Sequence, residues 1–277
     1  MSLLRWKMRR PVSSLNPVFC FVIVRARRLK RYVERWLGGK KYSEEISDKP
    51  LQHRVYKHQS VLIRRLGETD MQLQQNKVVN LKIAVGKLNG IIIAPGETFS
   101  FWLLVGNPTA KKGYLDGMLL SNGQATAGTG GGLCQIANLI RWICLHSPLE
   151  ITEHHHHSFD PFPDEGRVVP FGSGATVFYN YGDLQLTNPT QNTFQLLFWF
   201  DEKCINGDLR TDVPLPYKYH VYEKHHRFVK TGDAFYRQNE LWRDKYYKKG
   251  SGETIETVLI RKNNSRVLYT PESYEMS

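Results

Sequence analysis

The sequence predicts an α+β fold in which a few helices pack on a largely antiparallel β structure, with a basic amphipathic helix at the amino end. Apolar residues recur at helical spacing in three segments, 17–37, 76–90 and 133–147. From about residue 170 onward, alternating apolar and polar residues separated by turn-forming residues indicate strands. Helices that come first, followed by a block of strands, are typical of α+β folds rather than of alternating α/β folds.

The composition is that of a folded chain with an unevenly placed positive charge. Of its 277 residues, 41% are hydrophobic and 12% are aromatic, enough for a full core. The formal net charge of +12 favours anionic partners, but residues 1–41 contain many Lys and Arg and a single acid, Glu34. The excess positive charge is therefore concentrated in the amino-terminal segment rather than spread along a binding groove. Because no zinc-finger spacing or RNA-binding aromatic signature is present, we predict no nucleic-acid partner.

The amino-terminal helix has one apolar stripe, formed by Phe19, Val22, Ala26, Leu29, Val33 and Trp36. Its basic residues cover the other faces, and Gly38 and Gly39 end it. Such a helix can bind an anionic membrane surface through residues 1–41, or it can pack on the protein's own core with its arginines in solvent. An uncleaved export or anchor signal is a third reading.

The apolar stretch Val18–Val24 is too short to span a bilayer, which takes about 20 residues. No small-residue cleavage site follows it. We therefore expect a location that is cytoplasmic or peripheral at the inner membrane face.

The remaining elements follow in order along the chain. Residues 40–50 read as a linker, and residues 53–67 are ambiguous between strand and helix. Residues 91–102 predict two strands around a Pro95-Gly96 turn, and residues 107–117 predict a loop. Three strands are expected within 175–200, with turns at Gly182 and Asn188-Pro189, and antiparallel strands thereafter. We divide the chain into an amino-terminal segment (1–45), a core domain (46–205) and a β-rich extension of that domain (206–277).

The run "GTGGGLCQIAN", residues 128–138, places Cys134 in or next to the first turn of a helix. Unpaired backbone N–H groups and the positive end of the helix dipole favour a thiolate there. Gly131 and Gly132 would let a substrate approach closely, and N–H groups from Gly132 to Gln135 could stabilise an oxyanion. Asn138 and Arg141 share the face of Cys134 and could orient a substrate. A plain tight loop before a buried cysteine is the alternative.

A base for Cys134 could come from the four consecutive histidines His154–His157. In an extended segment, His155 and His157 would point to one side and the other two to the opposite side. An inward histidine would complete a Cys–His pair, with Asp160 or Asp183 as the acid that orients it. Cys134 with two histidines could also bind zinc, but the spacing matches no standard zinc signature, so we predict no metal and no cofactor.

The other cysteines are expected to play no part in this site. Cys144 lies among apolar residues of the predicted helix and is expected in the core. Cys20 and Cys204 have no identifiable partner, and we expect free thiols rather than a disulfide framework.

Five blocks, in this order and spacing, resemble the VanW family: "NLKIAVGKLNGIIIAPGETFSFW", "KGYLDGMLLSNG", "GTGGGLCQIANLI", "HHHHSFD" and "GATVFYNYGDLQLTN". The resemblance implies a role in bacterial glycopeptide resistance and cell-wall metabolism. In some exported family members, VanW domains are associated with L,D-transpeptidation of peptidoglycan, with the cysteine of the glycine block as nucleophile. That role would fall to Cys134. The histidine segment maps onto His155 and His157, ahead of Ser158, and the last block maps onto Asp183 and Asn188.

These observations predict a cysteine-dependent acyl transferase that acts on a peptidoglycan stem peptide or precursor. The expected catalytic residues are Cys134, His155, His157 and Asp183. The expected substrate-binding residues are Gly131, Gly132, Gln135, Asn138, Arg141 and Ser158. A non-catalytic binding or scaffold protein at the cytoplasmic membrane face is the alternative.

Overall fold

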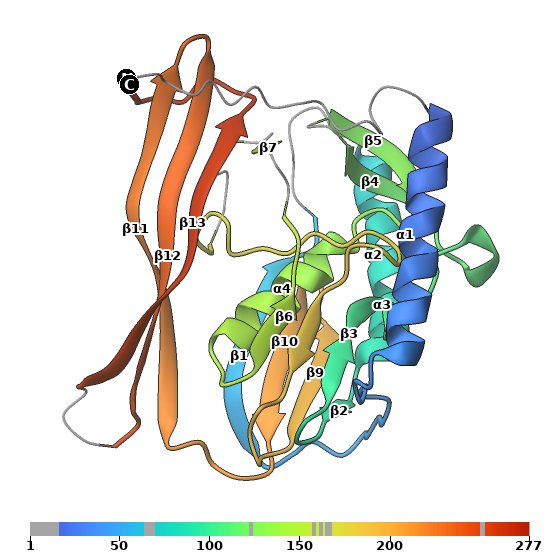
Figure 1. Ribbon diagram of the computed structural model, residues 1–277, viewed down its shortest axis with the longest axis vertical. Helices are drawn as coiled ribbons and strands as arrows, with labels where there is room; N and C mark the ends of the chain where they lie inside the picture. The colour runs from blue at the N-terminus through green and yellow to red at the C-terminus, as the bar shows by residue number, and fades with distance from the viewer. Residues whose placement is uncertain are drawn as a thin grey trace.

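The structure is a computed structural model that describes residues 17–63, 70–121, 124–156, 159–160, 163, 168–249 and 253–276. It confirms the α+β class, since helices pack against sheets that are mainly antiparallel (Figure 1). The helices within these ranges are α1 (Pro17–Leu37), α2 (Met71–Leu88), α3 (Phe101–Val105) and α4 (Cys134–Leu145), with a 3-10 turn, η2 (Ala110–Lys112).

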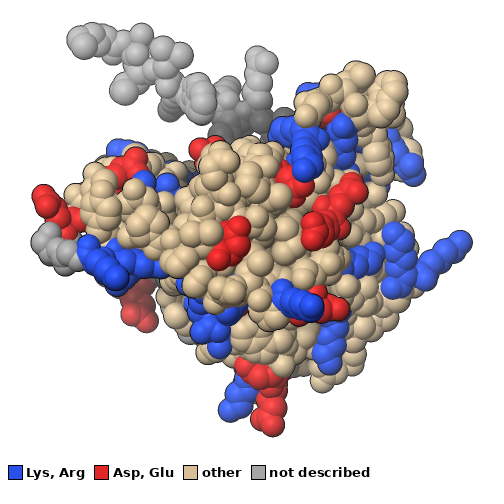
Figure 2. Space-filling model, turned by 90° about the horizontal axis from the view of Figure 1, so that it is seen from below, with Lys and Arg blue, Asp and Glu red and all other residues tan. Residues whose placement is uncertain are grey.

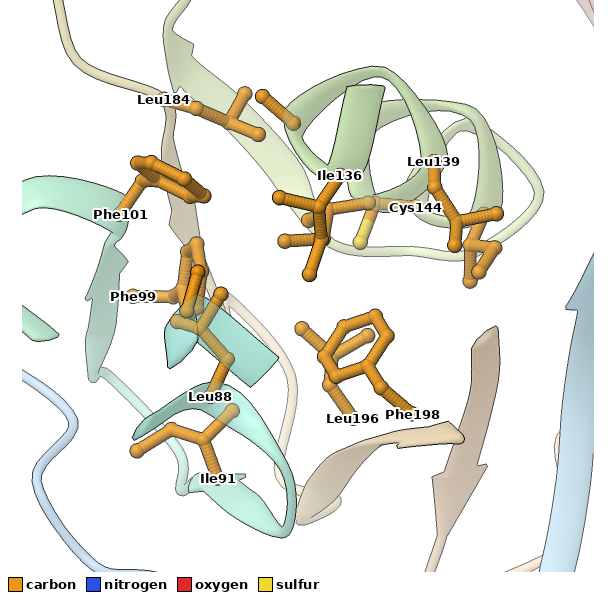
Figure 3. Close-up of a cluster of buried hydrophobic side chains, with 14 of the residues drawn as sticks. Leu88, Ile91, Phe99, Phe101, Ile136, Leu139, Cys144, Leu184, Leu196 and Phe198 are labelled. Atoms are coloured by element: carbon orange, nitrogen blue, oxygen red, sulfur yellow. The ribbon is translucent and has the colours of Figure 1, made fainter. Parts of the chain in front are cut away.

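A central antiparallel sheet carries the main core. Its strands lie in the order β1 (His53–Val61), β10 (Cys204–Thr211), β9 (Phe194–Phe200) and β2 (Ile91–Ile93), so the ambiguous segment 53–67 contains a strand. Side chains of α2, α4 and β9, such as Leu88, Ile136 and Leu196, point toward one another beside it (Figure 3). Cys144 is fully buried in the same cluster, which confirms its predicted place in the core.

Two smaller sheets complete this body. One has the order β3 (Thr98–Ser100), β8 (Gln185–Thr187) and β6 (Glu150–Glu153), and the other is the hairpin of β4 (Asp116–Ser121) and β5 (Gln124–Thr129).

Two predicted strands are wrong. The strand expected to include Trp102 ends at Ser100, because the Ser100 hydroxyl accepts the Leu103 N–H at 3.3 Å and caps α3. The first strand expected within 175–200 is a turn with isolated bridges, where Asn180 has a φ of 56°.

The last part of the chain forms a separate layer of long strands (Figure 1). The order is β14 (Glu275–Met276), β11 (Tyr217–Thr231), β12 (Ala234–Tyr247), β13 (Thr254–Val267) and β7 (Phe159–Asp160), which confirms the strands expected there. Trp142 and Leu145 of α4 pack against Val221 and Leu241 of this sheet. The boundary drawn between residues 205 and 206 falls inside β10, a strand of the central sheet.

Helix α1 lies along the body with three of its arginines, Arg28, Arg31 and Arg35, on its half-buried side, whereas the packed orientation considered from the sequence placed the arginines in solvent. Arg31 binds Glu153 (Nη2 to Oε1, 2.6 Å), and Arg35 lies 3.5 Å from Oδ2 of Asp183. The expectation that a packed α1 would leave its arginines in solvent is wrong for these residues, because carboxylates of the body bind them. The predicted apolar stripe is exposed instead, with Trp36 85% and Leu29 65% accessible.

Charges of both signs are interspersed on one face of the molecule (Figure 2). Seen from below the view of Figure 1, Lys and Arg side chains alternate with Asp and Glu over the visible face (Figure 2). None of the helices within the described ranges combines the length and the apolar character needed to cross a bilayer.

The glycine run before α4 is required by close packing within the chain. A Cβ on Gly131 would lie 2.2 Å from the backbone of Gly117 in β4. At Gly132, where φ is +91°, a Cβ would lie 2.1 Å from the side chain of Lys77. The side-chain amide of Asn80 in α2 donates a hydrogen bond to the Gly131 carbonyl at 2.9 Å and so links the glycine run to α2. The loop that precedes Cys134 is therefore held between α2 and β4.

Replacing Gly131 by alanine should lower the free energy of unfolding by about 3 kcal/mol, because the new methyl group would overlap the Gly117 backbone. Urea denaturation measures this. Gly86→Ala is the matched control, since Gly86 lies in α2 with nothing within 4 Å of its Cβ position. That variant should be as stable as the wild type or more stable by up to about 1 kcal/mol. Equal stability of the two variants would contradict the packing described.

Candidate functional site

Cys134 is the first residue of α4, as the sequence predicts. Its side chain is half-buried and packs against the main core, and its Sγ lies 3.9 Å from the Val177 carbonyl oxygen. Burial raises the pKa of the Cys134 thiol, although hydrogen bonds with the backbone oppose this. The expectation of a resting thiolate is therefore wrong, because loss of solvation outweighs the favourable helix end.

The face of α4 that carries Cys134 is hydrogen-bonded to residues 172–177. The Cys134 thiol bonds the carbonyl of Val177, and the Asn138 Oδ1 accepts the Ala175 N–H at 2.6 Å. One turn further on, Arg141 Nη1 donates to the Gly172 carbonyl at 3.3 Å and to the Ser173 carbonyl. The three residues share a face as predicted, and each uses at least one polar atom to hold this segment.

Gln135 and the two predicted glycines have structural contacts. The Gln135 Nε2 donates to Ser60 Oγ at 2.9 Å and to the Val61 carbonyl at 2.7 Å, which ties α4 to β1. Its own N–H donates to the Gly132 carbonyl, and the Gly131 N–H donates to the Gly128 carbonyl. The space beside Gly131 and Gly132 that was expected to admit a substrate is filled by this chain's own atoms.

His155 lies beside the segment that holds Cys134. Its backbone carbonyl accepts the Thr176 N–H at 2.8 Å, and its Nε2 lies 3.0 Å from Oε1 of Glu153. His155 and Cys134 thus flank the two residues 176–177. Among the described residues no imidazole nitrogen lies within hydrogen-bonding distance of the Cys134 sulfur. The other two predicted residues of this stretch, His157 and Ser158, lie outside the described residues.

Glu153 is a site residue that the sequence analysis missed. Burial alone would raise its pKa, but hydrogen bonds from His155, Arg31 and the Asp183 N–H lower the pKa of Glu153 to about 2. The carboxylate that orients His155 therefore belongs to the strand that leads into the histidines. The signal available in the sequence was the spacing of two residues in "EHH", which places both side chains on one face of a strand.

Asp183 organises a different part of the site. Its carboxylate accepts the Ser100 hydroxyl at 2.5 Å and the backbone N–H groups of Trp102 and Leu184 at 2.9 Å each. Burial raises the pKa of Asp183, although these hydrogen bonds oppose the change. Asp183 contacts His155 only indirectly, since its N–H donates to Glu153. Asp160, the other acid considered for the histidine, binds Arg237 at 3.2 Å.

The alternation predicted for the histidines is confirmed for the three that the structure describes. His155 points to Glu153, whereas His154 and His156 both contact Arg261 of β13. Within the described ranges, no three His, Cys, Asp or Glu side chains are grouped closely enough to hold a metal ion. Cys134, Cys144 and Cys204 are free thiols.

This geometry offers a thiol at a helix start and an oriented imidazole just after the next strand, β6. The thiol has no base in contact with it among the described residues, so chemistry at Cys134 requires a proton acceptor to come closer. The first N–H groups of a helix lack intrahelical partners, and at this end of α4 the N–H of Gln135 is already bonded to the Gly132 carbonyl.

Comparisons with known proteins cover this region. Residues 76–210 match a family model described as VanW like protein. The chain is 32% identical to the vancomycin B-type resistance protein VanW of Enterococcus faecalis, over 90% of this chain and 91% of that protein. It is 29% identical to the uncharacterized protein YoaR of Bacillus subtilis, over 39% of this chain and 34% of YoaR. No solved structure matches the chain.

Replacing Glu153 by glutamine should lower the free energy of unfolding at pH 7 by about 2–3 kcal/mol. Because the folded pKa of about 2 lies below the usual value, this stabilisation is complete above about pH 5. It is lost as the pH falls toward 2. Urea denaturation of both proteins from pH 7 to pH 3 measures the difference, which should shrink with acid.

Glu150→Gln is the matched control, because Glu150 is an exposed acid of the same strand. A difference between wild type and Glu153→Gln that stayed constant down to pH 3 would show that the carboxylate is not held as described.

Proposed function

This chain belongs to the VanW family, and we propose that it acts in glycopeptide resistance or cell-wall metabolism as a cysteine-dependent acyl transferase on peptidoglycan stem peptides or their precursors. The observation that carries the proposal is the position of Cys134. It begins α4, and His155, oriented by Glu153, lies across residues 176–177 from it. The relationship to the Enterococcus faecalis protein supports the choice of a cell-wall substrate.

The reaction begins with a proton transfer. The Cys134 thiol passes its proton to His155, and the sulfur attacks an amide carbonyl of the stem peptide. The N–H groups at the start of α4 stabilise the oxyanion. The C–N bond then breaks, the amine leaves with the proton from His155, and a thioester remains on Cys134. An amine or water attacks the thioester and releases the thiol. Because burial raises the pKa of this thiol, the general base is essential.

The remaining predicted residues have supporting roles in this proposal. Asn138 and Arg141 hold residues 172–177, which form one wall beside the thiol. The backbone N–H of Asp183 donates to Glu153 and positions that carboxylate, so Asp183 affects His155 only through Glu153. His157 and Ser158 stay predictions, as do substrate contacts by Gln135, Gly131 and Gly132.

Incubation of the reduced, folded protein with stem peptides or with an acylating carbapenem should add one acyl group to Cys134, detected as a mass increase of the intact protein. The adduct should form faster as the pH rises, because the reactive thiolate becomes more abundant. Cys134→Ser should give no thioester, whereas Cys204→Ser, which removes a buried thiol of β10, should behave like the wild type.

Absence of any adduct on folded wild-type protein, at every pH tested, would contradict acyl transfer. Retention of full resistance by Cys134→Ser in cells would favour a non-catalytic role instead.

A second function, binding at the inner membrane face, is favoured by the orientation of α1. The exposed apolar side chains of this helix include Phe21, Leu29, Val33 and Trp36. Residues of the stripe and Tyr42 line an open hollow of about 900 Å³. Since Arg31 and Arg35 are bound to the body, they hold the stripe outward. Exposed basic residues such as Arg25 and Lys30 add attraction to anionic lipid.

Sedimentation with anionic vesicles should therefore carry down the wild-type protein, and the double variant Leu29→Ser/Trp36→Ser should bind roughly tenfold more weakly or worse, because two apolar anchors are lost. The matched control is Val213→Ser/Leu268→Ser, which removes two exposed apolar side chains away from α1. Equal vesicle binding by the two double variants would rule out α1 as the membrane contact.

A further inference from the structure

Among the residues that the structure describes, the buried cation Arg141 has no carboxylate partner. Only 1% of its surface is exposed, and its Nη1 donates to the backbone carbonyls of Gly172 and Ser173. Its Nε is buried and has no hydrogen-bond partner among the described residues. A buried charge that is left unpaired is costly, so such groups usually have an opposite charge beside them.

Other arginines of this chain follow that rule. Arg237 is also buried and lies 3.2 Å from Asp160. Arg31 lies 2.6 Å from Glu153, and Arg210 lies 3.1 Å from Asp208. Arg141 departs from this pattern, because within the described ranges only backbone carbonyl groups accept its hydrogen bonds.

A second guanidinium, that of Arg261, is near enough to Arg141 to help lower the pKa of Arg141. Arg261 of β13 contacts His156 (Nη1 to Nδ1, 2.9 Å) and lies 3.5 Å from Nε2 of His154. Its Nε is also buried without a partner among the described residues. In the part of the chain that the structure describes, no carboxylate pairs with either arginine. α4, β13 and the start of the histidine run thus bring two arginines and two imidazoles together.

The lowered pKa values of Arg141 and His154 are those expected where positive charges lie close together. Burial and the nearby Arg261 lower the pKa of Arg141 to about 10. Burial, Arg141 and Arg261 lower the pKa of His154 to about 4, so this imidazole is neutral near pH 7. Two permanent cations therefore remain, with a neutral imidazole that can donate or accept a hydrogen bond.

We propose that Arg141, Arg261 and His154 form a binding site for the anionic group of a ligand, a carboxylate or a phosphate. Guanidinium groups match the paired oxygen atoms of both anions, and an anion would supply the negative charge that the described residues of this cluster do not provide. Arg141 lies seven residues from Cys134 on α4, about 10 Å along the helix axis. The site goes beyond acyl transfer and does not depend on the reactivity of the thiol.

Calorimetric titration of the full-length protein with sodium phosphate and, separately, with sodium acetate tests the site. Sodium chloride at matched ionic strength serves as the reference. We expect saturable binding of at least one anion. Arg261→Gln should weaken that binding about tenfold or more, because a charge-assisted hydrogen bond is lost. Arg266→Gln, which removes an exposed arginine of the same strand, should leave it unchanged.

Arg141→Lys provides a second variant that keeps the charge but removes the planar fork, and it should also weaken binding. Saturation by acetate alone identifies a carboxylate ligand, and saturation by phosphate alone identifies a phosphate group. Saturation by both supports the site as stated. Absence of saturable binding, or equal affinity of Arg261→Gln and Arg266→Gln, would overturn the proposal. Cys134→Ser should still bind the anion, so failure of acyl transfer and failure of this site are separable.

Discussion

The burial of α4 between two sheets is the constraint on which the rest of the molecule depends. Ile136, Ile140 and Ile143 face the core beside the central sheet, and Trp142 and Leu145 face the carboxyl-terminal layer. With nine of its twelve residues buried, this helix cannot shift or rotate without opening both interfaces. Cys134, Asn138 and Arg141 are therefore fixed relative to residues 172–177, to which all three are hydrogen-bonded.

Local patterns in the sequence were sufficient where local physics decides the outcome. The start of α4, the buried position of Cys144 and the alternation of His154 and His155 all follow from periodicity along one element. The side of α1 that packs inward could not be predicted this way. The carboxylate that binds Arg31 belongs to Glu153, which lies 122 residues further along the chain, and only tertiary folding brings the two side chains together.

In the candidate site too, tertiary packing decides a property that a local sequence motif does not predict. A helix start favours a thiolate, but the core packed around Cys134 raises its pKa, and that packing is invisible in a short motif. The glycine run likewise suggested room for a ligand, whereas Gly131 is required by the backbone of Gly117. The acid that contacts His155, Glu153, precedes the histidines in the sequence, whereas Asp160 and Asp183 follow them.

Helix α1 contacts the body and the solvent through two chemically different sides. Its inward contacts include ion pairs at the margin of the core, which mobile ions screen. Its outward surface is apolar, and excluded salts such as sulfate make the burial of such a surface more favourable. A rise in the concentration of such a salt would thus weaken the ion pairs that attach the helix to its own protein. The same change would strengthen the association of the exposed helix face with other apolar surfaces.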